Sequence, residues 1–305
     1  MATRTEYFAD ETVPLDLSDP WVVNKYHSQL VTDRRAALLN GFTANLRFDL
    51  DVVIPPSNPH PRSRHPPALP SNVPITFRLS EPLQSGLDEN SQVWTAVAEL
   101  PGGARTTVVF KIIQPSMCEY PEDPRESWDL YVFPQSRGKA ETWAYERLAH
   151  KQGHLIPYFL GMHPITAPCG EQAWVLVLEY IRGPSLVSYL KSATPNTQAD
   201  TCNVFKLCMQ TLTDFMDDGW CNFDVVPRNI IVAGTAGDRT VVLIDMTPTV
   251  RFDSAFSQLV GAKYKLYREM CDALEDPTGV EQAIENVRSE LAAARELVLH
   301  RLSKT

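Results

Sequence analysis

The sequence has no long hydrophobic run. None of its 305 residues falls in an uninterrupted apolar stretch of the roughly 18 residues that a transmembrane helix requires. The opening residues Met1–Tyr7 contain no apolar core of the kind that a secretory signal peptide carries. No internal repeat is visible either. We therefore expect a cytoplasmic protein without a membrane anchor.

Cysteine and positive charge are also in short supply. The six cysteines, at positions 118, 169, 202, 208, 221 and 271, form no C-x-x-C pair and have no histidines at zinc spacing. Isolated cysteines of this kind are typical of reduced thiols in an intracellular protein. Lys and Arg number 28 against 37 Asp and Glu, which gives a net charge of −9. This balance argues against broad binding to nucleic acid or anionic lipid, although a local basic pocket for phosphate remains compatible with it.

Hydrophobic residues make up 44% of the chain, enough for a sizeable core in one large domain or two small ones. Eight of the 24 prolines fall between Pro55 and Pro74, where they prevent regular helix or sheet. This stretch predicts an extended linker or surface arm. Residues 20–50 before it have helical spacing and lead into a strand-like segment, Asn45–Ile54. We therefore treat residues 1–74 as an N-terminal arm.

Residues 75–182 predict a small lobe built on an antiparallel sheet. The expected strands alternate apolar and polar residues or are rich in β-branched residues, and they span Ile75–Leu79, Gln92–Leu100, Thr106–Ile113, Tyr158–Gly161 and Ala173–Tyr180. Pro101-Gly102-Gly103 supplies a turn. A helix is expected over Lys139–Lys151, with Ala140, Trp143, Ala144 and Leu148 on its buried side and Gly153 as its stop.

Residues 183–305 predict a second, mostly helical lobe. Helices are expected over Val187–Lys191, Thr201–Asp217 and about 254–302, with short strands at Ile230–Val232 and Val241–Ile244. The two lobes would join near Tyr180–Pro184. The predicted fold class is therefore α+β in two lobes, with a sheet-based N-lobe that holds one helix and a reduced helical C-lobe.

Three short segments carry candidate chemistry. Lys111 stands alone in an apolar strand, so it either binds an anion or is an edge-strand lysine that reaches water. Asp224 and Asn229 precede an apolar strand, where they could serve as a base and a metal ligand or could satisfy their own turn. Asp245 follows another buried strand and could bind Mg²⁺ or cap the next turn.

Taken in order, these segments resemble the protein-kinase-like superfamily, which includes aminoglycoside and choline phosphotransferases. Lys111 matches the lysine of its V-A-I-K motif, Asp224 and Asn229 match its H-R-D-x-x-x-x-N loop, and Asp245 matches the Asp of D-F-G. The fungal kinase-like group is the most similar. Its motifs correspond to Glu141-x-x-x-Tyr145-x-x-Leu148, Gln152-Gly153, Ile156-Pro157-x-x-x-Gly161, Pro227-Arg-Asn-Ile-Ile-Val232 and Leu243-Ile-Asp245. The resemblance covers about residues 75–255.

The resemblance implies an ATP- and Mg²⁺-dependent phosphotransferase. In it, Lys111 would hold the α- and β-phosphates and a helix carboxylate would hold Lys111. Glu141 is the expected carboxylate and Glu146 the alternative. Asn229 and Asp245 would bind Mg²⁺, Asp224 would orient or deprotonate the acceptor hydroxyl, and the backbone of Glu179-Tyr180-Ile181 would meet the adenine. The expected partners are thus a nucleotide and an acceptor that the sequence does not name.

Several positions depart from the family pattern. The glycine-rich loop is replaced by Leu83–Val93, which has one glycine and two acids. Asn222 stands where the family has His, Val226 where many kinases have Lys, and Met246-Thr247 where they have Phe-Gly. No A-P-E segment follows Asp245, so a small-molecule acceptor is expected rather than a peptide, bordered by the N-terminal arm or by the insertion 115–135 with Trp128, Tyr131 and Phe133. A nucleotide-binding pseudokinase and a biosynthetic enzyme on the kinase fold are the alternatives.

Overall fold

The computed structural model describes residues 42–49, 64–84, 91–115, 134–168, 170–192, 198–217, 219–222, 224–247, 249–251, 256–274, 281, 284–289 and 291–292. They form an α+β fold with a mainly antiparallel sheet and several helices, as the sequence predicts. The chain divides into two compact units. The first holds 42–49, the described part of Pro66–Thr142, and Phe159–Tyr180; the second holds 64–65, Trp143–Tyr158 and the described residues from Ile181 onward.

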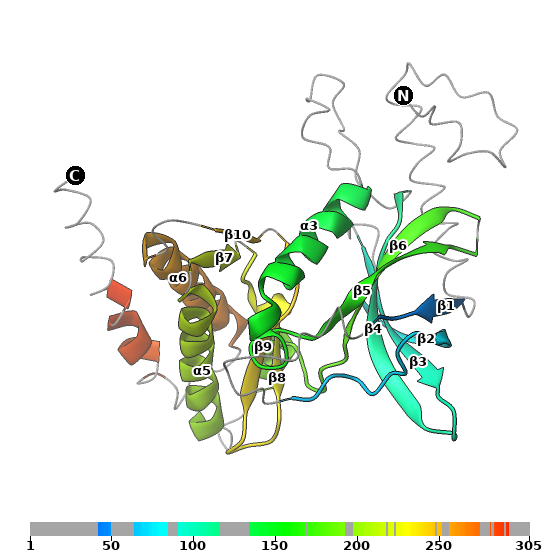
Figure 1. The fold of residues 1–305 in the computed structure, drawn as a ribbon. Coiled ribbons are helices and arrows are strands. Elements are labelled where there is room, and N and C mark those ends of the chain that lie inside the picture. The colour runs from blue at the N-terminus through cyan, green and yellow to red at the C-terminus, as the bar shows by residue number, and fades with distance from the viewer. Residues whose placement is uncertain are drawn as a thin grey trace, which may run out of the picture. The chain divides into compact units, whose positions relative to one another are not determined.

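The first unit is built on a six-stranded sheet in the order β1-β2-β3-β4-β6-β5 (Figure 1). Its strands are β1 (Thr43–Arg47), β2 (Pro74–Gln84), β3 (Gln92–Glu99), β4 (Arg105–Ile113), β5 (Phe159–Thr166) and β6 (Gln172–Glu179). All five strands expected from residue 75 onward are present. The sixth, β1, comes from the segment expected to be an arm, and it extends the sheet by pairing Ala44 with Phe77.

Side chains alternate between buried and exposed most clearly in β2. In β2, Ile75, Phe77 and Leu79 are buried while the residues between them are exposed, as a strand with one core face requires. Phe77 packs against Phe110 of β4 at 5.3 Å between ring centroids. The β3–β4 turn needs positive φ at Gly102, 88°, which glycine adopts without strain.

Helix α3 (Pro134–Arg147) begins earlier than expected and is followed by a 3₁₀ turn, η4 (Ala149–Lys151). The prediction of its buried face is partly wrong. Ala144 and Leu148 are buried, but Ala140 is exposed and Trp143 is 41% exposed. The face is completed by Gly138, Glu141 and Tyr145, so its buried stripe includes a carboxylate that apolar periodicity could not reveal.

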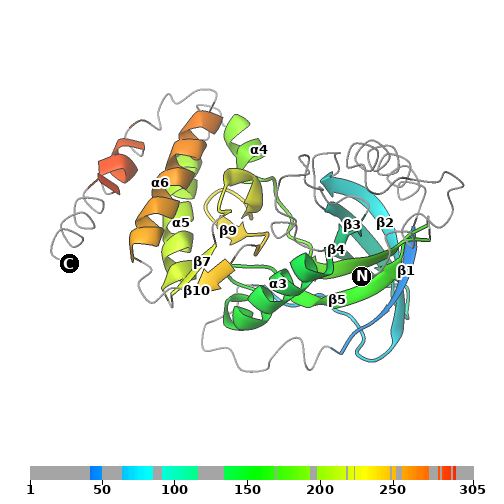
Figure 2. The ribbon, with the colours of Figure 1, turned by 90° about the horizontal axis from the view of Figure 1, so that it is seen from above.

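The second unit contains helices α4 (Leu186–Lys191), α5 (Gln198–Met216) and α6 (Phe256–Ala273). Its strands form two antiparallel pairs, β7 (Trp220–Asn222) with β10 (Thr249–Arg251) and β8 (Ile230–Ala233) with β9 (Thr240–Leu243), and the 3₁₀ turn η6 (Pro227–Asn229) leads into β8. Helices α5 and α6 lie side by side (Figures 1 and 2). The pair β7–β10 was not expected, because three residues are too few to show alternation.

Several expectations fall on residues outside those described: the helix before residue 42, the Pro-rich stretch up to residue 63, residues 85–90 of the loop before β3, and the aromatics of the insertion 116–133. The domain boundaries at residues 74 and 182 stay predictions. Within the described part of the chain, no helix combines the length and the apolar character needed to cross a bilayer.

Candidate functional site

Lys111 lies on an interior strand of the sheet. It belongs to β4, where it pairs with Val93 of β3 on one side and Leu176 of β6 on the other. An interior strand cannot release a lysine to water along a sheet edge, so the edge-strand interpretation does not hold. The Lys111 side chain is only 12% exposed, and an ammonium group this buried needs a counter-charge.

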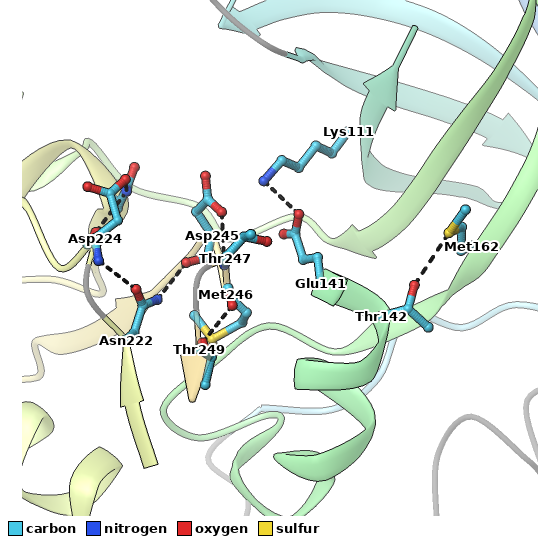
Figure 3. Close-up of polar contacts among 11 residues, drawn as sticks. Lys111, Glu141, Thr142, Met162, Asn222, Asp224, Asp245, Met246, Thr247 and Thr249 are labelled. Carbon is cyan, nitrogen blue, oxygen red and sulfur yellow. Dashed lines mark hydrogen bonds and ion pairs between the residues drawn. The ribbon is translucent and has the colours of Figure 1, made fainter. Parts of the chain in front are cut away.

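Glu141 of α3 supplies that counter-charge. Lys111 Nζ lies 2.8 Å from Glu141 Oε2, and the Glu141 side chain is 2% exposed (Figure 3). Gly138 of the same helix packs closely on the sheet: a Cβ there would lie 3.0 Å from Met162 Sδ and 3.4 Å from Ile113 Cδ1, so a larger residue would require Met162 to shift slightly. The predicted pairing with Glu141 is therefore confirmed. Its alternative, Glu146, is exposed.

In the second unit, the loop between β7 and β8 carries Asp224 and Asn229. The Asn229 side-chain amide donates two hydrogen bonds to Asp224, at 3.0 Å to its carbonyl and 2.9 Å to Oδ2. Both of these atoms are acceptors, so the NH₂ group of Asn229 must face them and its Oδ1 must point the other way. Asp224 keeps 33% of its side chain exposed, with the exposed Arg228 guanidinium 3.7 Å from Oδ2. The loop thus satisfies its own turn and still presents a carboxylate and an amide oxygen.

Asp245 lies in a second loop, directly after β9. Its φ of +60° is in the left-handed region, which non-glycine residues enter at a cost, Asp among the least. Asp245 Oδ1 accepts the N–H of Thr247 at 3.3 Å, as a turn-capping residue would. No helix begins here; the next element is β10. Ile244 donates to the carbonyl of Asn229 at 2.8 Å, which ties the two loops together.

A buried side chain, Asn222, joins the same two loops (Figure 3). It is 2% exposed, accepts the N–H of Asp224 at 2.8 Å through Oδ1, and donates through Nδ2 to the carbonyl of Asp245 at 2.7 Å. From the sequence, Asn222 is notable only because it stands where the kinase-like family has a histidine. The structure gives it a physical task, since it holds the backbones of both loops at once.

Thr247 is a further polar residue at this place. Its hydroxyl oxygen is buried and, among the residues the structure describes, has no hydrogen-bond partner. A native protein rarely leaves such an atom unsatisfied unless a water, ion or ligand completes it. The described residues include no cluster of three His, Cys, Asp or Glu side chains. Mg²⁺ does not require one, because it is commonly held by one or two protein oxygens together with waters and substrate phosphates. Asp245, Asn229 and Thr247 offer oxygen atoms of the kind that this cation binds.

The segment Glu179-Tyr180-Ile181 carries the chain from the first unit into the second. Glu179 ends β6 and is 8% exposed, and Ile181 packs with Ala233 and Val242. The expected role of this segment's backbone in binding adenine stays a prediction. Lys111 and Glu141 belong to the first unit, whereas the oxygens fitted to Mg²⁺ belong to the second.

Comparisons with known proteins add no family assignment. No family model matches the chain, and no curated protein matches its sequence.

Proposed function

We propose that the chain is an ATP- and Mg²⁺-dependent phosphotransferase with a two-lobed, protein-kinase-like fold. The observation that carries this proposal is the ion pair between Lys111 and Glu141. Of the two helix carboxylates that the resemblance allowed, the one its motif favours meets the strand lysine at 2.8 Å. The arrangement of Asp224, Asn229 and Asp245 on two joined loops supports the same function.

Bound Mg²⁺-ATP would supply the phosphoryl group and the cation that offsets its charge. Lys111, oriented by Glu141, would bind phosphate oxygens. Asp245 and Asn229 would hold the metal through oxygen atoms. Asp224, with a third of its side chain exposed, would accept the proton of an acceptor hydroxyl, whose oxygen would take the γ-phosphoryl group of ATP while ADP leaves.

The acceptor that we propose is a small-molecule hydroxyl. Helix α6 begins at Phe256, shortly after the loop of Asp245, which leaves little chain for the activation segment that peptide-directed kinases use. We place the reaction in the cytoplasm. The four described cysteines, Cys202, Cys208, Cys221 and Cys271, are free thiols, as a reducing compartment favours.

A nucleotide-binding pseudokinase is the second candidate, and a specific observation favours it. Val226 is 7% exposed and apolar at the position where many kinases carry a lysine that touches the γ-phosphate. A protein without that cation could bind a nucleotide and transfer nothing. A biosynthetic enzyme on the same fold would use the same lysine, acid and metal. It would be distinguished from a phosphotransferase by identifying its reaction product, because the two sites would be alike.

Thermal unfolding with and without Mg²⁺-ATP tests the proposal. A ligand that binds the native state stabilises it by RT ln(1 + [L]/Kd), about 2.7 kcal/mol at 100 times Kd. We expect wild type to gain stability and Asp245→Ala to lose the Mg²⁺-dependent part. Asp238→Ala is the matched control, because Asp238 is exposed in the β8–β9 turn. Wild type that shows no shift at millimolar Mg²⁺-ATP contradicts the proposed function.

A further inference from the structure

Arg64, from the Pro-rich segment expected to be a linker, binds the turn after α3. Its guanidinium donates to the carbonyls of His154 at 2.9 Å and Ile156 at 2.8 Å. Its backbone N–H donates to the carbonyl of Gly153 at 2.9 Å, and its own carbonyl accepts a hydrogen bond from the Tyr158 hydroxyl at 3.0 Å. Four hydrogen bonds, two of them from the charged guanidinium, therefore anchor Arg64 to segment 153–158.

The turn is shaped for this contact. Gly153 has φ of +75°, and a Cβ at that position would lie 2.3 Å from the hydroxyl oxygen of Tyr158. Glycine is therefore required twice, once for the backbone angle and once to leave space for the tyrosine ring. The fully buried Tyr158 in turn directs its hydroxyl to Arg64. Gly153 is thus tied to the Arg64 contact through Tyr158.

The same turn binds β9 on its other side. The carbonyl of Leu155, between the two carbonyls that Arg64 occupies, accepts the N–H of Leu243 at 2.9 Å. The carbonyls of residues 154 and 156 accept from Arg64 while that of residue 155 accepts from β9, so the two contacts use adjacent peptide groups of one turn. Leu243 is the last residue of β9 and lies two residues before Asp245.

We propose that Arg64 is a positioning residue for Asp245: it holds segment 154–156, and that segment holds the strand that carries Asp245 to the metal. The consequence for the metal rests on the proposed function. The mechanical link from Arg64 to Leu243 does not. All the residues of this link belong to the second unit.

Amide hydrogen exchange tests the mechanical link in the full chain. Arg64→Gln should raise the exchange rate of the Leu243 N–H at least tenfold, whereas the Val232 N–H, bonded to Pro184, should keep its rate. Arg64→Lys, with a single cationic centre, should give a smaller increase. Arg47→Gln is the matched control, because Arg47 also donates to a backbone carbonyl, that of Asn72, but in the first unit. An unchanged Leu243 rate, or an equal rise at Val232, overturns the proposal.

If Arg64→Gln does not fold, Tyr158→Phe removes only the hydroxyl bond to Arg64. It should still raise the Leu243 rate severalfold, and an unchanged rate overturns the proposal equally. The effect on metal binding is measured separately. In Arg64→Gln, the Mg²⁺ concentration that gives half of the ATP-dependent stabilisation should rise at least threefold. Wild type without that stabilisation contradicts the proposed function, while the exchange result still decides whether Arg64 holds β9.

Discussion

Asn222 and Asp245 are joined by a buried hydrogen bond of 2.7 Å from the asparagine side chain to the aspartate carbonyl. The other end of the same amide accepts the N–H of Asp224 at 2.8 Å. The orientation of the amide is fixed, because a carbonyl only accepts and an N–H only donates. This side chain therefore helps to hold the loops of Asp224 and Asp245 together, alongside the bond from Ile244 to the Asn229 carbonyl.

Replacement of Asn222 should disturb both loops. Asn222→Asp places an acceptor against the Asp245 carbonyl, and Asn222→Leu removes both bonds; each should lower the free energy of unfolding by about 1–3 kcal/mol, the cost of buried groups left unsatisfied. Asn222→His, which can donate and accept, should recover part of the loss. Urea denaturation measures the effect. Asn45→Asp, at an exposed position of β1, is the control, and equal losses at both positions would contradict the role of Asn222.

The ion pair of Lys111 with Glu141 makes a second prediction, which separates stability from binding. Lys111→Met leaves the 2% exposed Glu141 without its cation and should cost about 3–5 kcal/mol of unfolding free energy. The double change Lys111→Met with Glu141→Leu should recover most of that stability, because an apolar pair can replace a buried ion pair. Stabilisation by Mg²⁺-ATP should be absent in both variants. A double variant that still gains stability from the nucleotide would contradict phosphate binding by Lys111.

These residues also show how far the sequence alone could lead. The strands of the sheet could be predicted because alternating or β-branched residues are typical of extended segments. The buried face of α3 could not be predicted from apolar spacing alone. Glu141 lies on that face beside Lys111 of β4, and this contact joins residues thirty positions apart in the chain. Trp143, which apolar spacing assigned to the core, instead lies at the surface.

The roles of Asn222 and Arg64 could not be predicted from the sequence, for a related reason. Both act through backbone carbonyls and N–H groups of distant segments, and backbone groups leave no trace in the residue types of the sequence. Asn222 could be noted only for standing in the place of a histidine. The Pro-rich composition around Arg64 predicts neither helix nor sheet, and the described residues 64–70 form neither, but composition gives no indication of where the arginine binds.

His163 of β5 gives a pH prediction. Burial lowers the pKa of its imidazole below 6.5, against an opposing hydrogen bond with the backbone of Leu160, and its Nε2 is buried without a hydrogen-bond partner among the described residues. The unfolded chain therefore binds the proton more readily than the native protein, so stability is lost as the pH falls through and below 6.5. The unfolding free energy should decrease between about pH 7 and about pH 5, and less so in His163→Gln. His65→Gln, at an exposed position, should keep the wild-type slope.

The last prediction concerns Asp224 and separates a phosphotransferase from a nucleotide-binding scaffold. Asp224→Asn keeps an oxygen that can accept from Asn229 Nδ2, so the fold and the affinity for Mg²⁺-ATP should change little. It removes the charge that would attract the acceptor proton, and roles of this kind are worth roughly 10²–10⁴ in rate. The measurement is transfer of label from γ-labelled ATP into a small-molecule cell extract, with Asp238→Asn as control. Retained nucleotide binding with lost transfer supports catalysis, because only the charge has changed. A variant that transfers label at the wild-type rate would show that Asp224 only shapes its turn. Wild type that binds Mg²⁺-ATP but transfers no label would favour the pseudokinase candidate.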